Sequence, residues 1–380
     1  MSLVLVVAAG LFLRTFASLN QLPLGFVPEP LLVAELNLQA SGGPPQERGA
    51  RVKRLRDATA AVPGVRSAAV SSVRLLTGGG WASGGVAIGD GPMSPNRPLL
   101  WLNGTTPGWF ETMGIPLRNG RDFEAGDRVG ARLVAIVNET FVRRYLPGER
   151  PIGQSVRLAF DAGTRYEIVG VVGDTVYTTP REGMLATMYV PMAQRKPSEF
   201  WPTVLLTIKA TPGTRAIVER DVAAALTQAD STVAFTFGTF DQLVEATFTQ
   251  ERLLAMLSAF FGGLALLLAA VGLYGVVAHA VRARQTEIGL RMALGAAPSS
   301  IVRLVFQRVG VLIAAGLAFG LAGSLWAVRF VEALLFHLEA RDPVTFAGAA
   351  AVLVAVGVLA AWMPARRAAW LDPATVLREG

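Results

Sequence analysis

Three long stretches of the chain are apolar and contain no Asp, Glu, Lys or Arg. They run from Leu253 to Val281, from Val309 to Val328 and from Pro343 to Ala365. A helix rises about 1.5 Å per residue, so roughly 20 apolar residues cross a hydrocarbon core of about 30 Å. A helix in the core of a soluble protein would keep a polar outer face at helical spacing, and these stretches have none. We therefore predict a transmembrane helix in each of them.

The first apolar stretch, from Met1 to Leu13, is ended early by Arg14. As a helix it is about 20 Å long, which is too short to cross a membrane alone. It also lacks the basic residues before the apolar run and the small residues after it that mark a secretory signal peptide. We expect residues 1–20 to be a first transmembrane helix whose upstream part is missing.

Arginines are unevenly shared among the short segments that flank these helices. Five lie within 282–308 and three follow residue 365, whereas only Arg329 and Arg341 lie between the second and third long stretches. Cytoplasmic loops carry the excess of Lys and Arg, so loop 282–308 and the C-terminus are predicted to be cytoplasmic and residues 15–252 extracytoplasmic. In a bacterium this describes a multi-pass protein of the inner membrane. The net charge of +7 then follows from topology and from proximity to membrane lipid, and we predict no nucleic-acid partner.

The extracytoplasmic block begins with the pattern of a strand, a helix and a strand. Alternation over Leu32–Leu38 predicts a half-buried strand, apolar residues at helical spacing predict a helix over 46–62, and a second strand is predicted over 65–73. A second such unit is predicted downstream, with strands over 203–210 and 232–237. The helix between these two strands is predicted to place four residues on one buried face: Ile217, Val218, Val222 and Leu226. The two units together predict a split, ferredoxin-like α+β layer.

The insertion between the two units, residues 85–198, is predicted to be a β-rich lobe with two short helices. Thr106 is predicted to cap a helix over 107–113, and Asn138 to cap a helix over 139–146. Strands are predicted over 133–137, 155–159, 166–172 and 187–190. The fold class is thus an α+β membrane protein, in which a transmembrane helical bundle carries a large extracytoplasmic α+β domain. We expect that domain at 21–250, with its layer at 21–84 and 199–250, and the helical domain at 251–380.

The composition excludes several kinds of chemistry. Hydrophobic residues make up 52% of the chain and charged residues 17%, there is no cysteine, and there are two histidines. No lysine follows a glycine in a phosphate-binding loop, so the chain is not a conventional P-loop ATPase. His279 lies at the end of a predicted span and His337 in a short loop, which disfavours a Ser-His-Asp site. Asp122, Glu124 and Asp127 are interpreted as a solvated turn. We predict no enzymatic activity, no metal and no cofactor.

Two features of the predicted membrane helices bear on transport. The three stretches contain no ionisable residue except His279, so polar cargo is not expected to pass between them. The G-x-x-x-G spacing of Gly316 and Gly320 fits close helix packing and ordinary membrane-helix composition equally well.

The loop between the first two long stretches carries the strongest local signal. Thr286 can cap a short helix, Ile288, Met292 and Gly295 share one face of it, and residues 295–300 interrupt it before the next helix. This pattern predicts an elbow at the membrane surface. From the residues alone, an amphipathic turn that lies on the lipid with snorkelling arginines is an equally good interpretation.

The elbow resembles the FtsX-like permease domain of MacB-type ABC transporters, whose inner loop reads close to R-x-x-E-I-G-x-R-x-A-L-G-A. The residues that match, or lie within the match, are Glu287, Ile288, Gly289, Arg291, Met292, Ala293, Leu294, Gly295 and Ala296, with Gln285 standing where relatives often carry a basic residue. The tail is similar to the P-A-R-R-A…D-P…L-R ending of that family, at Pro364, Arg366, Arg367, Asp372 and Pro373. Residues 108–117 (GWFETMGIPL) and 168–174 (IVGVVGD) resemble the MacB periplasmic core domain. These motifs are most similar to those of the duplicated-permease branch, in which two such permease halves are fused. The chain would correspond to one of these halves.

The resemblance implies a permease subunit driven by a separate cytoplasmic ABC ATPase, which would bind the elbow. It also implies a dimer with itself or with a second permease half, and a periplasmic adaptor as a further candidate partner. Two alternatives stay open: an extracytoplasmic sensor or scaffold that relays a signal without moving cargo, and an inert half of a split permease. The sequence does not name a cargo.

Overall fold

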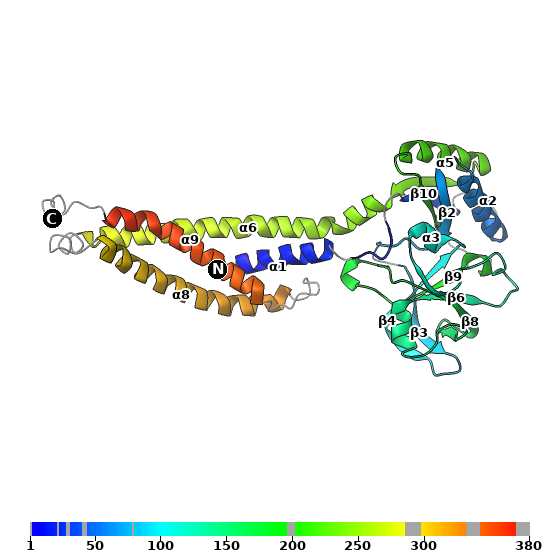
Figure 1. Cartoon of the computed structure of the whole chain (residues 1–380), viewed down its shortest axis with the longest axis horizontal. Coiled ribbons are helices and arrows are strands. Elements are labelled where there is room, and N and C mark those ends of the chain that lie inside the picture. Colours follow the sequence, from blue (N-terminus) through cyan, green and yellow to red (C-terminus); the bar gives the residue numbers. More distant parts are fainter. Residues whose placement is uncertain are drawn as a thin grey trace. The chain divides into compact units, whose positions relative to one another are not determined.

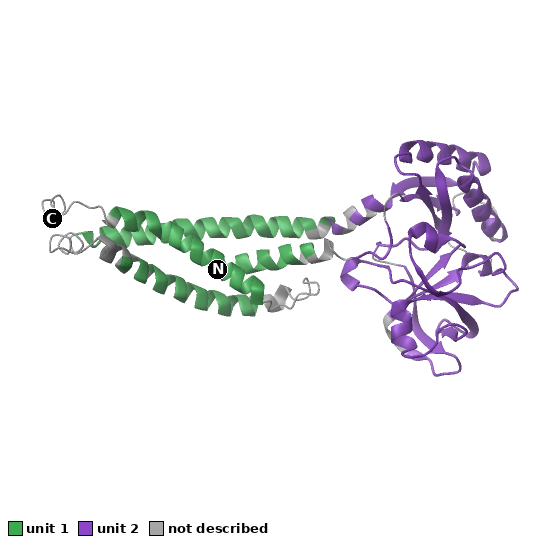
Figure 2. Cartoon of the chain, in the orientation of Figure 1, with its two compact units in different colours: residues 1–21, 249–380 green, residues 22–248 purple. Residues whose placement is uncertain are grey.

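The structure is a computed structural model that describes residues 2–20, 23–27, 31–39, 44–77, 80–195, 202–285, 298–331 and 343–369. The chain forms two compact units (Figures 1 and 2). Unit 1 comprises Met1–Gln21 and Thr249–Gly380, and unit 2 comprises Leu22–Phe248.

In unit 2, a four-stranded antiparallel layer is built from two separated pieces of the chain. The first piece holds β1 (Leu31–Asn37), α2 (Arg48–Ala60) and β2 (Val65–Ser71), and the second holds β10 (Thr203–Ala210), α5 (Arg215–Ala229) and β11 (Ala234–Thr239). The strand order is β11-β1-β10-β2, so each β-α-β unit has a strand of the other unit between its two strands. This interleaving is the split arrangement that the two patterns predicted, and neither unit can form its part of the sheet alone.

The helices α2 and α5 cover one face of this layer and close a hydrophobic core beneath them. Val52 and Leu55 of α2 and Val222 of α5 are buried against Leu32 and Leu206 of the sheet. Three of the four residues predicted on the buried face of α5 are buried, but Ile217 is 59% exposed. It lies next to the buried Val218 in the helix, at the margin of the buried face, and points away from the core.

The opposite face of the layer is also buried at one end, where the sequence predicted an exposed face. Val33, which alternates with Leu32 and Ala34, is 2% exposed and belongs to a second core with Trp109, Tyr177 and Tyr189. The prediction of a half-buried β1 is therefore wrong for this end of the strand. The face of β1 that carries Val33 is buried by residues of the inserted lobe, which are more than 70 positions away in the sequence.

The inserted lobe contains a closed six-stranded barrel. Pairings run β4-β3-β7-β8-β6-β9, and β9 pairs with β4 in parallel to close the ring. The lobe's strands are β3 (Trp81–Ile88), β4 (Ser94–Thr105), β5 (Leu117–Gly120), β6 (Val134–Asn138), β7 (Ser155–Leu158), β8 (Asp161–Val172) and β9 (Thr187–Pro191). Its helices are α3 (Trp109–Met113) and α4 (Glu139–Tyr145), and short 3-10 turns lie at Pro180–Glu182 and Met192–Gln194, with another at Pro45–Glu47 before α2. The barrel core includes Leu102, Val137, Phe141, Val156 and Ile168.

Helix starts and strands in the lobe depart from the predictions at several points. Asn138 caps α4 as predicted, because Phe141 N donates to Asn138 Oδ1 at 2.9 Å. Thr106 does not cap α3: its hydroxyl accepts from Val70 N on β2 at 2.8 Å, and Gly108 in the left-handed region precedes the helix instead. The strands β3, β4 and β5 were not predicted, and β3 begins at Trp81, before the expected start of the insertion at residue 85.

Unit 1 contains α1 (Ser2–Asn20), α6 (Phe240–Arg282, which begins in unit 2), α8 (Pro298–Val331) and α9 (Pro343–Ala369). Three of them are long and apolar enough to cross a membrane, over Arg252–Arg282, Val309–Trp326 and Pro343–Arg367. The apolar part of α1, Ser2–Arg14, is shorter. It packs against α8 and α9, with Leu3, Val7 and Leu11 buried beside Ala349. The predicted α+β membrane fold class is confirmed.

Candidate functional site: the helix ends around residues 286–297

The elbow connects two of the membrane helices, since α6 ends at Arg282 and α8 begins at Pro298. The predicted elbow residues from Glu287 to Ala296 lie outside the described residues, as do Asp372 and Pro373 of the tail. The structure describes the helices that precede and follow the elbow in the sequence, α6 and α8, and the helix α9 that packs with them.

These three helices contribute one packed hydrophobic cluster, which we call the helix-end cluster. It consists of Val277 of α6, Val309 of α8, and Ala361 and Ala365 of α9, all buried, and of four partly buried neighbours: Leu273, Val281, Phe306 and Ile313. Phe306 also contacts Trp362 edge to face, with ring centroids 6.5 Å apart. The C-terminal ends of α6 and α9 therefore meet the N-terminal half of α8 in this cluster.

Small residues on α9 allow this close packing. Gly357, Ala361 and Ala365 follow one another at four-residue spacing on one helix face. A Cβ atom at Gly357 would lie 2.5 Å from Ile313 Cδ1, so a larger residue would force the Ile313 side chain of α8 to shift, whereas its 3.4 Å distance from Leu273 Cδ2 of α6 would be an ordinary contact. Small residues at every fourth position in an apolar helix are a recognisable packing signal, but this stripe was not among the sequence predictions.

The surface around the cluster is basic. Arg282 and Arg303 are exposed, and Arg366 and Arg367 lie in the exposed last turn of α9, where cations complement the helix dipole. Arg367 Nη1 donates to the Tyr274 hydroxyl of α6 at 3.4 Å. Pro364 was predicted in a cytoplasmic tail, but it is a buried residue inside α9, which continues to Ala369. The first part of the predicted tail is thus helical and belongs to the bundle.

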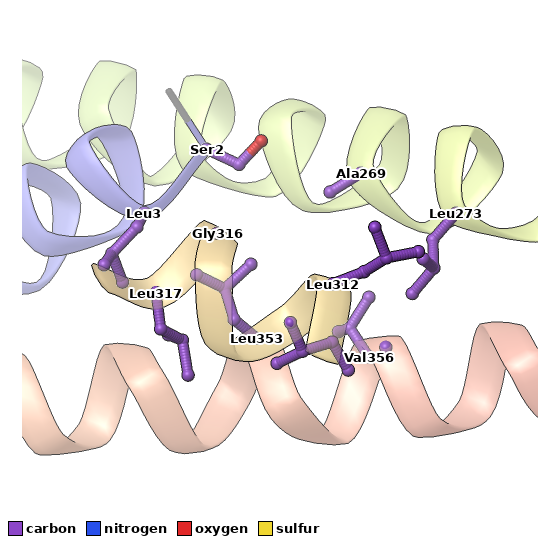
Figure 3. A pocket seen from close by; sticks show the side chains of 11 residues that line it. Ser2, Leu3, Ala269, Leu273, Leu312, Gly316, Leu317, Leu353 and Val356 are labelled. Atoms are coloured by element: carbon purple, nitrogen blue, oxygen red, sulfur yellow. The ribbon is translucent and has the colours of Figure 1, made fainter. Parts of the chain in front are cut away.

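A cavity of about 240 Å³ lies deeper in unit 1, among α1, α6, α8 and α9 (Figure 3). Its lining is aliphatic, with Leu273, Leu312 and Leu353 among the contributors, and the Ser2 hydroxyl is its only side-chain polar group. No lining residue is ionisable. A cavity of this kind suits apolar contacts and lacks the groups that bind ions or relay protons in membranes.

Of the three carboxylates of unit 2 that were interpreted as a solvated turn, Glu124 is solvated, with its side chain 65% exposed, whereas Asp122 and Asp127 are structural. Asp127 is 7% exposed, and its carboxylate accepts hydrogen bonds from Arg121 Nη1 at 2.8 Å and from Arg121 Nη2 at 3.0 Å. Burial alone would raise the pKa of Asp127, but the hydrogen bonds from Arg121 and from Glu124 N hold it below the ordinary value. Burial raises the pKa of Asp122, which accepts from Gly108 N and Phe123 N. Asp127 thus closes its own turn, and Asp122 connects that turn to the start of α3.

Known proteins match the chain over nearly its whole length. The family model of the MacB-like periplasmic core domain matches residues 2–228, and the model of the FtsX-like permease C-terminal matches residues 259–373. The chain belongs to the MacB/FtsX family of ABC transporter permeases. The second match contains the helix-end cluster, the elbow and Asp372 and Pro373. The resemblance drawn from the sequence motifs is confirmed for the family, and the duplicated-permease branch remains a prediction.

The MacB/FtsX relatives differ in length. The "Macrolide export ATP-binding/permease protein MacB 1/2" of Paracoccus denitrificans is 26% identical over 73% of this chain and 42% of its own length. The "Uncharacterized ABC transporter permease YknZ" of Bacillus subtilis is 24% identical over 73% of this chain and 69% of its own length. The periplasmic region of MacB from Actinobacillus actinomycetemcomitans covers 59% of this chain at 14% identity and a TM-score of 0.41. The chain thus spans less than half the length of the first of these relatives.

Proposed function

We propose that this chain is the permease subunit of a MacB/FtsX-type ABC transporter, in which a separate cytoplasmic ATPase binds the elbow. Nucleotide-driven movement of the elbow is passed through the membrane helices to the extracytoplasmic domain. The output is efflux or mechanical transmission, and no hydrolysis occurs in this chain. The subunit acts as a dimer with itself or a second permease half, and a periplasmic adaptor can bind its outer domain.

The observation that carries the proposal is the helix-end cluster. A displacement of the elbow pulls on α6 and α8 directly, and the contacts of Val277, Val309 and Ala361 oblige α9 to follow. Close-packed interiors transmit displacement because they have low compressibility. α6 then continues as one helix of 43 residues from Phe240 in unit 2 to Arg282 in unit 1. The chain therefore leads from the elbow to the outer domain through α6.

The sequence supports the assignment of the motor to another subunit. None of the chain's lysines, at positions 53, 196 and 209, stands in a G-x-x-x-x-G-K-[ST] loop. ATP turnover has to come from a protein with such a loop. The arginine distribution supports a cytoplasmic elbow, which is the side on which that protein can bind.

The test is ATP turnover by the cognate ATPase, reconstituted in lipid vesicles with the permease. Arg291→Glu and Gly295→Asp change the elbow and leave every residue of the helix-end cluster as it is, and we expect each to remove most of the stimulation. Arg54→Glu is the matched control, because it makes the same charge change at an exposed position of α2 in unit 2, away from the helix-end cluster and its basic surface. Full stimulation by the double variant Arg291→Glu, Gly295→Asp would contradict the proposal.

The same assay separates transport from the sensor alternative. If an outer ligand changes ATP turnover while nothing accumulates across the vesicle membrane, the chain relays a signal. If cargo accumulates only in the presence of ATP and the intact elbow, the chain transports.

A further inference from the structure

One edge of the sheet in unit 2 is open. β11 pairs with β1 over Leu32↔Thr239 to Asn37↔Ala234, and no described strand pairs with its other side. The outer N–H and C=O groups of this strand are therefore available to another strand. Thr236, at its middle, is exposed.

The open edge lacks the features that usually protect such strands. β11 reads AFTFGT and contains no charge, no proline and no register shift. β5, which pairs only with β8 among the described strands, shows the contrast. It has four residues, carries Arg118 and has a register shift between Leu117 and Asn119. Charges, short length and bulges are how edge strands avoid pairing with other chains. β5 is protected against strand addition and β11 is not.

A groove runs along the same edge. It has a volume of about 340 Å³ and is bounded by the C-terminal half of β11 and the first turns of α5. Its lining residues are Arg215, Glu219, Phe237, Gly238, Thr239 and Gln242. Arg215 Nη1 in this lining lies 3.5 Å from Asp241 Oδ2 and forms an ion pair with it.

We infer that β11 pairs antiparallel with β11 of a second copy of this chain and joins the two extracytoplasmic layers into one sheet. This inference rests on the proposed function, in which the permease acts as a dimer, and assigns that dimer a contact surface. A two-fold axis at Thr236 sets Thr236 opposite its own copy and Phe235 opposite Phe237 of the other copy. Thr–Thr and aromatic–aromatic cross-strand pairs are favourable.

Self-pairing fits the size of the edge and its place in the chain. The five residues of each β11 that pair about this axis, 234–238, bury much less surface than a stable interface between free proteins, which needs about 1,000 Å². The contact suffices here because α6 begins at Phe240, directly after β11, and leads into the helices of unit 1. Two copies held in one membrane meet at a raised effective concentration.

Cysteine cross-linking in native membranes tests the register, because the chain contains no cysteine. Opposite residues of an antiparallel pair have Cα atoms about 4.5–5.5 Å apart, within the range of a disulfide. We expect mild oxidation to link Thr236→Cys chains into a dimer, and to link Ala234→Cys chains with Gly238→Cys chains in a mixture. Ala234→Cys alone is the matched control: its two copies are four positions apart, about 14 Å along the strand, and should stay monomeric.

The controls separate the surface from the permease role. Thr227→Cys, exposed on α5, measures chance collision, and Thr236→Lys should remove the dimer through like charges, whereas Thr227→Lys should not. Equal linking of the Thr236→Cys and Thr227→Cys variants, or linking of Thr236→Cys to a different protein, overturns the inference. If Thr236→Cys chains stay monomeric while the natural chain still stimulates the ATPase, the β11 contact is wrong and the permease role stands. Absence of stimulation by the natural chain contradicts the permease role whatever the cross-links show.

Discussion

Asn138 shows how one buried side chain can connect three segments of the lobe. Its Oδ1 accepts from Phe141 N in α4 and from Thr187 N in β9, each at 2.9 Å, and its Nδ2 donates to Leu185 O at 2.8 Å. The residue is fully buried. Its amide therefore satisfies backbone groups that have no access to water, and such groups are costly to leave unpaired.

We expect Asn138→Ala to lower the free energy of unfolding of unit 2 by about 2–4 kcal/mol, because it removes a helix cap and leaves buried backbone groups unpaired. Asn119→Ala, at an exposed position of β5, should change it by less than about 0.5 kcal/mol. Pulse proteolysis of the full chain across a urea titration reports the midpoint for unit 2. Equal midpoints for the two variants would show that Asn138 is not a structural link.

A pH dependence follows from Asp127. The hydrogen bonds from Arg121 hold the pKa of Asp127 below its ordinary value, despite burial. A lowered pKa in the folded state contributes stability above the ordinary pKa of about 3.9, and this contribution is lost as the pH falls through the lowered value. We expect the natural chain to exceed Asp127→Asn in stability at about pH 6 and the difference to shrink towards about pH 3. Glu149→Gln, in an exposed loop, is the control for general charge effects, and a pH-independent difference would contradict the assignment.

Residue roles were predictable where the partner is near in sequence. Asn138 caps a helix that starts at the next residue, so its role follows from residue type and position. Thr106 has the same capping chemistry, but its hydroxyl bonds Val70, 36 residues away, through the β2–β4 contact. Asp127 pairs with Arg121 only because the turn between them folds back. The local sequence pattern therefore does not show whether a polar side chain caps a neighbouring helix or bonds a residue that only the tertiary fold brings near.

At the scale of elements, apolar helices and regular strands were predicted and the irregular strands were not. β4 contains Pro95 and Pro98, and β3 contains Gly84 and Gly85, which weaken any strand signal. Both become strands because the barrel supplies partners on each side, β7 for β3 and β9 for β4. The closure of the barrel, and with it the burial of the second face of β1, was therefore beyond a single-sequence pattern.

The G-x-x-x-G spacing in α8 gives a matched pair of variants for helix packing. A Cβ at Gly320 would lie 2.9 Å from Leu3 Cβ of α1, whereas a Cβ at Gly316, one turn away, would meet nothing within 4 Å. We expect Gly320→Leu to destabilise the bundle by about 1–3 kcal/mol, because overpacking forces the two helices apart. Gly316→Leu should have an effect below about 0.5 kcal/mol. The thermal midpoint of the bundle in detergent measures both, and equal losses would mean that α1 does not pack at Gly320 in solution.

At the scale of the whole molecule, the division into units followed from where charge is absent. Three uncharged stretches indicated the membrane helices. The long segment between the first apolar helix and Leu253 was therefore predicted to form a separate domain. The helix-end cluster did not follow in the same way, because it depends on which faces of α6, α8 and α9 meet. The stripe of Gly357, Ala361 and Ala365 would have indicated one of these faces, but not its partners.

The sidedness of the molecule is the last prediction, and it rests on connectivity and charge together. α6 joins unit 2 at its N-terminal end and the elbow at its C-terminal end, so a membrane-spanning α6 puts the two on opposite sides. The arginine excess around the elbow decides which side is cytoplasmic. In intact spheroplasts, an impermeant thiol reagent should label Ala125→Cys, at an exposed position of unit 2, and should label Ala296→Cys only after the membrane is opened. Labelling of both variants in sealed spheroplasts would place elbow and outer domain on the same side, and an ATPase in the cytoplasm could not then drive the chain through its elbow.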